Sequence, residues 1–253
     1  MLTMTRYGHP TALPPLLIVH GLFGSARNWG AIARRMASDR EVVAVDMRNH
    51  GESPWFPVHG YAEMAADLAE VIDAIGGRAD VVGHSMGGKA AMQLALTHGE
   101  RVNRLVVADI APVAYGHTQS HLIAAMRGLD LTGLDGRMEA DRRLASAVTD
   151  PGVRAFLLQS LDLKAVPPRW RLNLDVLDAE MPRIIGWPGT DGRFDGPVLF
   201  LAGAASDYVR PEHRTEIKRL FPQARQAKIP GAGHWLHADR PREFEAALRA
   251  FLG

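Results

Sequence analysis

The stretch VVGHSMGGKAAM, residues 81–92, places one serine among three glycines, between an apolar run and a segment of helix-forming residues. The spacing Gly83-x-Ser85-x-Gly87 is typical of a nucleophile elbow, a strained strand-to-helix turn that exposes a serine hydroxyl. Glycines suit such a turn because the neighbouring backbone comes close enough to collide with any Cβ atom. We predict that Ser85 is a catalytic nucleophile; the alternative is a glycine turn with an incidental serine.

Short apolar runs alternate with helix-length amphipathic segments along most of the chain. Buried strands are predicted at 15–21, 41–46, 79–84, 103–109 and 197–203, with a weaker edge strand at 224–229 and at most one or two small strands before residue 15. Helices are predicted at 26–38, 61–76, 86–98, 211–221 and 241–252. This alternation predicts an α/β fold, a mostly parallel sheet with helices on both faces.

Residues 112–195 break the alternation, because they contain helical stretches but no convincing buried strand. An insertion of this length is too long for a simple loop. We therefore predict a helical cap inserted before the penultimate strand of the sheet. The predicted domains are an α/β core, residues 1–111 and 196–253, and the cap, residues 112–195.

The composition of the 253-residue chain limits the classes of binding partner and of chemistry that we expect. A formal net charge of +1 gives no reason to expect nucleic acid or an anionic membrane surface. The absence of cysteine excludes disulfides and thiolate chemistry. The first residues lack the pattern of a signal peptide, and no stretch reaches the roughly 18 apolar residues of a membrane span. We expect a soluble, cytoplasmic protein.

A serine nucleophile needs a base, and in this type of site the chain order is serine, acid, histidine. His234 lies in the loop IPGAGHWLHAD after the last predicted strand, so we expect His234, and not His237, to be the base. Two aspartates end core strands between Ser85 and His234, namely Asp109 and Asp207. From the residues alone, either aspartate suits the order, and either could be a turn residue.

Acyl transfer also needs hydrogen-bond donors for the oxyanion. One predicted donor is the backbone N–H of Met86, which follows the nucleophile. The second is expected in the loop HGLFGSARNW, with Leu22 as the first candidate and Phe23 as the second, unless this loop is an ordinary glycine turn. Large apolar residues either line the substrate pocket or pack the cap onto the core; the candidates for the pocket are Phe23, Phe156, Trp170, Trp187 and Trp235.

Five motifs in series carry a family resemblance: LIVHGLFGS, VDMRNHGESP, GHSMGGKA, DIAP and GAGHWLHAD. Together they resemble the α/β-hydrolase superfamily over nearly the whole chain, and the YbfF-type bacterial esterases and their mitochondrial relatives in particular. The resemblance implies a serine ester hydrolase with a Ser-His-Asp triad and an acyl-enzyme intermediate. It implies no metal and no organic cofactor.

The resemblance also favours one of the two aspartates. The superfamily usually places its acid three residues after the glycine that ends the penultimate strand, and that position holds Ser206. In the YbfF-type subgroup the acid is the aspartate of the DIAP motif, which is Asp109 here. We therefore expect Asp109 to be the acid, with Asp207 as the alternative.

Two further motif positions are expected to be structural. Asp46, Arg48 and His50 of the DMRNHGES motif are interpreted as a hydrogen-bonded turn at the top of the sheet. Lys89, on the helix after the nucleophile, is interpreted as a packing or surface residue.

Several functional alternatives stay open. The resemblance implies short-chain esters or acyl-CoA thioesters, but the ten basic and eleven acidic residues of 112–195 form no evident phosphate clamp. A perhydrolase or a carbon–carbon bond hydrolase would keep the same Ser–His pair, and the fold also hosts non-catalytic ligand-binding or receptor modules. We expect a small-molecule ester or thioester substrate and a monomer or homodimer.

Overall fold

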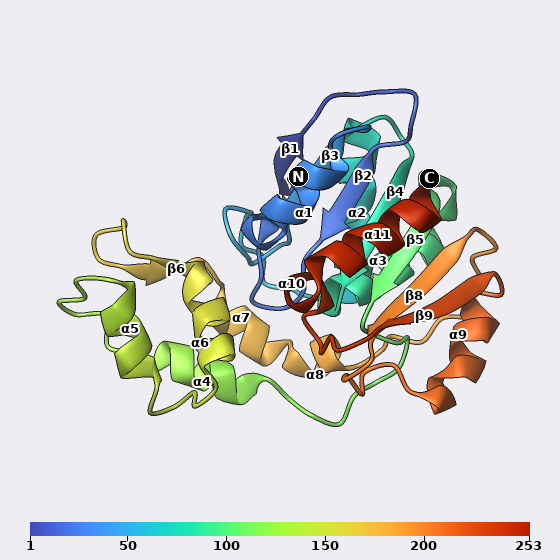
Figure 1. Ribbon diagram of the computed structural model, residues 1–253. Helices are drawn as coiled ribbons and strands as arrows, with labels where there is room; N and C mark the ends of the chain where they lie inside the picture. The colour runs from blue at the N-terminus through green and yellow to red at the C-terminus, as the bar shows by residue number, and fades with distance from the viewer.

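The computed structural model describes all residues, 1–253, and is built around one seven-stranded sheet (Figure 1). The strand order is β1-β3-β2-β4-β5-β8-β9, and only β1, which pairs with β3, runs antiparallel to its neighbour. The predicted, mostly parallel sheet is therefore confirmed. The strands are β1 (Thr3–Tyr7), β2 (Leu16–Val19), β3 (Val42–Asp46), β4 (Ala79–His84), β5 (Val102–Ala108), β8 (Val198–Gly203) and β9 (Ala224–Ile229).

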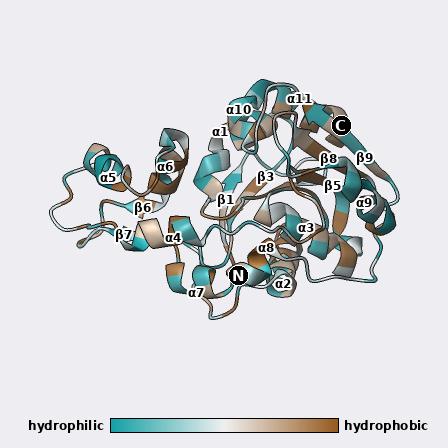
Figure 2. Ribbon diagram, turned by 90° about the horizontal axis from the view of Figure 1, so that it is seen from below, coloured by the Kyte–Doolittle hydropathy of each residue, from teal (hydrophilic) through white to brown (hydrophobic).

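Helices cover both faces of the sheet. Successive apolar side chains of its strands point to opposite faces, so both faces must be shielded from water. Leu17 and Val19 of β2 belong to the apolar cluster that includes α2, α3 and α9, whereas Leu16 and Ile18 belong to the cluster that includes α1, α10 and α11. The hydrophobic strands run between helices that turn polar sides outward (Figure 2). These helices are α1 (Gly30–Met36), α2 (Tyr61–Ala74), α3 (Met86–Thr97), α9 (Arg214–Leu220), α10 (Leu236–Asp239) and α11 (Pro241–Leu252).

Residues between β5 and β8 form a separate group of helices beside the sheet (Figure 1). Besides the predicted helices they contain a hairpin of two-residue strands, too short to give an apolar run in the sequence. The division into core and cap at residues 112–195 stays our prediction, and we keep the name cap for these residues. Its elements are α4 (Ser120–Arg127), α5 (Arg137–Leu144), α6 (Pro151–Leu157), η3 (Leu158–Ser160), β6 (Leu161–Asp162), β7 (Arg169–Trp170), α7 (Leu174–Ala179) and α8 (Met181–Ile185).

The sequence and the structure differ mainly at the ends of helices. Two predicted helices open with a 3-10 turn, η1 (Ala26–Trp29) and η4 (Pro211–His213), and a third short turn, η2 (Gly99–Arg101), precedes β5. Strand β9 lies at the edge of the sheet, as predicted, and its four middle residues are exposed. No helix combines the length and the apolar character needed to span a membrane.

Candidate active site

Ser85 occupies the turn between β4 and α3, at the carboxyl end of the central strand. Its φ of +53° lies in the left-handed region, which non-glycine residues seldom adopt. A Cβ atom on Gly83 would collide with the Gly87 carbonyl group, and one on Gly87 would collide with the His20 carbonyl oxygen. The two glycines therefore allow the close backbone approach that holds the turn in this shape.

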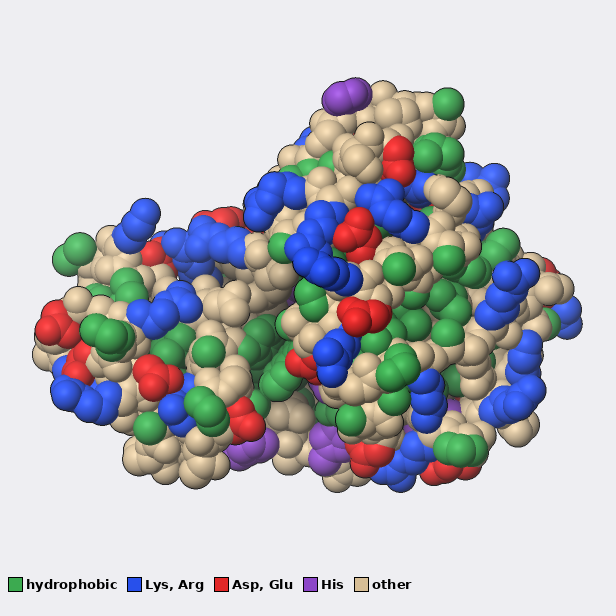
Figure 3. Space-filling view, viewed as in Figure 1, with side chains coloured by type: hydrophobic (Ala, Val, Ile, Leu, Met, Phe, Trp, Pro, Cys, Tyr) green, Lys and Arg blue, Asp and Glu red, His purple; other side chains and the backbone are tan.

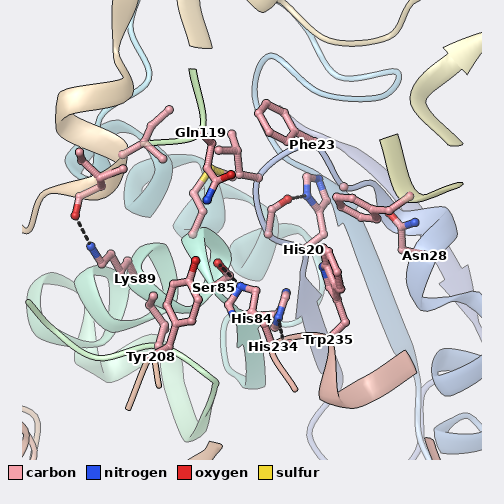
Figure 4. Close-up of a pocket in the computed structure, with 18 of the residues that line it drawn as sticks. His20, Phe23, Asn28, His84, Ser85, Lys89, Gln119, Tyr208, His234 and Trp235 are labelled. Carbon is pink, nitrogen blue, oxygen red and sulfur yellow. Dashed lines mark hydrogen bonds between the residues drawn. The ribbon is translucent and has the colours of Figure 1, made fainter. Parts of the chain in front are cut away.

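Three side chains from separate loops meet at this turn, and Figure 4 shows two of them, Ser85 and His234. His234 Nε2 lies 3.0 Å from Ser85 Oγ, and His234 Nδ1 lies 2.8 Å from Asp109 Oδ2. Asp109 is fully buried directly after β5. Because a carboxylate only accepts hydrogen bonds, Nδ1 carries the ring proton and Nε2 is left to accept from the serine hydroxyl.

The carboxylate of Asp109 is held by two further donors from the end of β8 and the loop after it. The Gly203 N–H donates to Oδ1 at 2.9 Å, and Ser206 Oγ donates to Oδ2 at 2.5 Å. The other candidate acid, Asp207, is not at the site: its side chain is 83% exposed and pairs with Arg210 on the surface. The structure therefore brings Asp109, and not Asp207, to His234.

Two of the three candidate oxyanion donors, the backbone N–H groups of Leu22 and Met86, make no hydrogen bond within the protein, and both residues line the same cavity as Ser85. Met86 is the first residue of α3, whose first N–H groups have no partner inside the helix. The alternative donor is already engaged, because the Phe23 N–H donates to His50 Nε2 at 3.1 Å. Of the three candidates, Leu22 and Met86 therefore keep free N–H groups, whereas the Phe23 N–H is engaged.

With this geometry in view, the relationship to known proteins can be stated. A family model described as the alpha/beta hydrolase fold matches residues 14–241. The chain belongs to the α/β-hydrolase family. The hydrolase is 44% identical over 251 residues to the sn-1-specific diacylglycerol lipase ABHD11 of Mus musculus, with 95% of this chain and 81% of the relative covered.

Two further relatives are esterases. Esterase YbfF of Escherichia coli (strain K12) is 41% identical over 241 residues, with 94% of this chain and 92% of the relative covered. A solved structure described as a marine microorganism esterase matches with a TM-score of 0.93 and 36% identity, over 99% of this chain and 98% of the other. The resemblance to YbfF-type esterases is confirmed, and the chain is a serine ester hydrolase of the α/β-hydrolase fold.

Two residues that the sequence did not single out support His234 in the hydrolase. His84 Nε2 lies 2.8 Å from the backbone carbonyl of His234, and the ring of Tyr208 stacks on the imidazole at 4.0 Å between centroids and 19° between planes. His84 directly precedes Ser85 in the elbow motif, but no pattern in the sequence assigned a role to His84 or to Tyr208. Both contacts restrict the orientation of the ring whose nitrogens face Ser85 and Asp109.

Several other histidines are buried and neutral. Burial lowers the pKa of His20 to about 4 and that of His50 to about 3. Burial also lowers the pKa of His237 to about 3, and this ring stacks on Trp29 at 4.1 Å and makes no hydrogen bond to Ser85. His237 therefore lies in the cavity wall against Trp29, and the ring that bonds to Ser85 is that of His234.

The DMRNHGES motif forms the predicted hydrogen-bonded turn. Asp46 accepts from the Ala26 N–H at 2.8 Å, and Arg48 makes a two-pronged contact with Asp67 at 2.6 and 2.8 Å. The Nδ1 of His50 contacts the Arg48 carbonyl oxygen at 2.9 Å, which leaves Nε2 as an acceptor. None of Asp46, Arg48 and His50 lines the pocket at Ser85, so the turn supports the site without forming its wall.

A cavity of about 320 Å³ opens at Ser85, between the cap and the sheet, and more than half of its lining residues are hydrophobic. Hydrophobic side chains gather in the hollow between these parts in Figure 3. Of the five candidates for the pocket, Phe23, Phe156 and Trp235 line this cavity. Trp170 and Trp187 do not: the Trp170 indole is buried and donates to the Met126 carbonyl oxygen, and Trp187 packs beside Tyr61.

Lys89 is the one lysine or arginine in the cavity wall, yet it is 1% exposed. Its ammonium group donates to the carbonyl oxygens of Ile185 (3.0 Å) and Gly186 (2.5 Å), at the end of α8. Burial lowers its pKa to about 7. Lys89 therefore ties the nucleophile helix to the cap, in keeping with the packing role expected for it. No cluster of three or more histidine, aspartate or glutamate side chains is arranged to hold a metal ion.

Proposed function

We propose that the hydrolase cleaves carboxylic esters through an acyl-enzyme formed on Ser85, with His234 as the general base and Asp109 as the acid. The observation that carries this proposal is the continuous chain of contacts from Ser85 Oγ through His234 to Asp109, at the floor of a largely apolar cavity. Leu22 and Met86 are the proposed oxyanion donors, since their N–H groups are free and both residues line the cavity at Ser85.

In the first half of the reaction, Ser85 Oγ attacks the ester carbonyl carbon while His234 Nε2 accepts the hydroxyl proton. Negative charge then develops on the carbonyl oxygen, and the two free N–H groups stabilise it. Asp109 stabilises the imidazolium that forms on His234, without itself taking the proton. Collapse of the tetrahedral intermediate expels the alcohol, which receives its proton from Nε2.

In the second half, a water molecule takes the place of the alcohol. His234 Nε2 removes a proton from this water as it attacks the acyl carbon, and the same N–H groups stabilise the second oxyanion. When the intermediate collapses, the bond to Ser85 Oγ breaks and Nε2 returns the proton to the serine. The products are a carboxylic acid and the free enzyme, and no redox cofactor takes part in these steps.

The walls of the cavity favour an uncharged ester with an apolar acyl chain. Leu122, Val153, Phe156 and Ile184 surround the space beyond Ser85, and the one lysine there is bonded to the cap. The diacylglycerol lipase relative suggests glycerol esters as one such class of substrate. Coenzyme A thioesters are less favoured because no exposed cation in the cavity wall would bind their phosphates. Cytoplasmic localisation and a monomeric or homodimeric state stay predictions.

Labelling with a fluorophosphonate probe tests this proposal, with the Ser85→Ala variant beside the wild type. The wild type should be labelled and should hydrolyse p-nitrophenyl esters, whereas Ser85→Ala should show neither property. Ser146→Ala, a change of an exposed cap serine, is the matched control and should react like the wild type. Labelling that persists in Ser85→Ala would assign the nucleophile to another residue.

The substrate is tested by comparing p-nitrophenyl acetate, butyrate, octanoate and palmitate with acyl-CoA esters of the same chain lengths. We expect higher kcat/KM values for the oxygen esters, with an optimum chain length set by the depth of the cavity. A preference for the coenzyme A esters at every chain length would replace the carboxylic ester with a thioester as the proposed substrate.

A further inference from the structure

Phe23 adopts a strained conformation in the loop that contains the proposed oxyanion donor Leu22. Its φ of +64° lies in the left-handed region, where a bulky residue persists only if its surroundings hold it. The Gly24 N–H donates to the Gly21 carbonyl oxygen at 3.0 Å, so Leu22 and Phe23 are the two central residues of a tight turn. Leu22 directly precedes Phe23 in this turn. A change of the Phe23 backbone toward a less strained conformation would therefore move the Leu22 N–H.

Two buried side chains hold the backbone of Phe23, one at its N–H and the other at its carbonyl oxygen. The Phe23 N–H donates to His50 Nε2 at 3.1 Å, and the Phe23 carbonyl oxygen accepts from Ser160 Oγ at 2.8 Å. His50 is fully buried and Ser160 is 5% exposed. His50 belongs to the turn after β3, whereas Ser160 is the last residue of η3 in the cap. We call His50 and Ser160 the Phe23 clamp.

The two sides of the Phe23 clamp are joined to each other through the backbone. The Ser160 carbonyl oxygen accepts from the Arg171 N–H at 2.8 Å, and the Arg171 carbonyl oxygen accepts from the Gly51 N–H at 2.8 Å. An antiparallel β-bridge also pairs Leu172 with His50. The cap therefore meets the turn after β3 and the oxyanion loop in one hydrogen-bonded network.

We propose that Ser160 is a positioning residue for the reaction: through Ser160, the cap fixes the loop that presents the Leu22 N–H to the oxyanion. This inference rests on the proposed function, because it assumes that Leu22 is an oxyanion donor. Ser160 does not line the cavity and so does not touch the substrate. Oxyanion donors act by being held in place before charge develops, so a loss of Ser160 should slow turnover and leave substrate binding unchanged.

The test compares three substitutions at Ser160 in the full chain. Ser160→Ala removes the donor, Ser160→Cys keeps the volume with a weaker donor, and Ser160→Thr keeps the hydroxyl. For the alanine and cysteine variants we expect kcat to fall about tenfold with KM within about twofold of the wild type, a part of the effect of losing one oxyanion donor. Ser160→Thr should restore most of kcat.

Gln159→Ala is the matched control. Gln159 directly precedes Ser160 and accepts a cap-to-core hydrogen bond from Asn28 (2.6 Å), but it makes no hydrogen bond to Phe23. It should leave kcat near the wild-type value. Inhibition by an alkyl trifluoromethyl ketone, which forms an oxyanion on the serine, should weaken in parallel with kcat in Ser160→Ala. Inhibition by the product carboxylic acid should stay the same.

The outcomes separate this inference from the proposed function. If Ser85→Ala abolishes turnover while Ser160→Ala and Ser160→Cys keep wild-type kcat, the positioning role is wrong and the proposed function stands. An equal loss of kcat in Gln159→Ala, or a rise of KM alone in the Ser160 variants, would also overturn it, since either result indicates general loosening of the cap. If Ser160→Ala does not fold, the cysteine and threonine variants decide by the same criteria.

Discussion

Asp109 and Asp207 carry the same side chain and follow neighbouring strands at the same edge of the sheet, yet their surroundings are opposite. Asp109, after β5, is fully buried and faces three donors, from His234, Gly203 and Ser206. Asp207, after β8, is 83% exposed and makes one surface ion pair. The difference shows that a strand-end aspartate becomes a candidate acid only where neighbouring loops enclose it.

The backbone explains why Asp109 turns inward. It follows β5 directly with a φ of +51°, a region that aspartate tolerates better than most residues, and its N–H donates to the Leu201 carbonyl oxygen of β8 at 2.9 Å. Asp207 lies four residues beyond the end of β8, in a loop that faces solvent. Ser206 occupies the position where the superfamily usually has its acid, and in this chain its hydroxyl donates to the carboxylate of Asp109.

Among the changes that test this comparison, Asp109→Asn should have the largest effect. An amide at this position would favour the wrong tautomer of His234, so we expect kcat to fall about 1,000- to 10,000-fold. Asp207→Asn is the matched control and should change kcat less than about twofold, since exposed ion pairs contribute little. Steady-state kinetics with a p-nitrophenyl ester checks both. A larger loss in Asp207→Asn than in Asp109→Asn would reverse the comparison.

A second prediction moves the acid to the other strand. Ser206 Oγ lies 2.5 Å from Asp109 Oδ2, and Oδ2 is the atom that His234 contacts. The double variant Asp109→Asn with Ser206→Asp would therefore place a carboxylate close to His234. We expect kcat to recover about 10- to 100-fold over Asp109→Asn, and not fully, because small misplacements are costly. No recovery in a folded double variant would mean that the carboxylate cannot reach His234 from residue 206.

A third prediction tests whether His237, in the wall of the same cavity, is as shielded from water as its stacking on Trp29 indicates. The folded pKa of His237, about 3, lies below the ordinary value of 6.5, so the stability this group contributes is complete above pH 6.5 and declines as the pH falls toward 3. Between pH 7 and pH 5, the His237→Phe variant should therefore lose about 2 kcal/mol less free energy of unfolding than the wild type. Urea unfolding at the two pH values measures this; equal losses would mean that the ring titrates normally.

The smallest effect is expected at the donor that joins the two strand ends. Ser206→Ala removes one hydrogen bond to the Asp109 carboxylate, and we expect kcat to fall about tenfold with the fold retained, the size of a charge-assisted bond. Ser206→Thr, which keeps the hydroxyl, should lose less. Kinetics together with thermal unfolding separates this effect from a loss of structure, and an unchanged kcat in Ser206→Ala would show that Gly203 alone holds the carboxylate.

Much of the fold followed from local patterns. The β-strands could be predicted because buried parallel strands are continuous apolar runs, and the long helices because their apolar residues recur on one face. The β6–β7 hairpin was missed because each strand has two residues, and α10 because it has four. Short elements such as these are fixed by contacts with distant residues, which leave no periodic signal.

The same contrast applies to the site. The sequence by itself determined that Ser85 lies in an elbow and that His234 follows the last strand, because glycine spacing and chain order constrain the backbone locally. Only the tertiary structure decided that Asp109 meets His234, that His50 accepts from the Phe23 N–H, and that Trp170 and Trp187 do not line the cavity. These features depend on which way a side chain points across a packed interface, and that direction is set by residues remote in the chain.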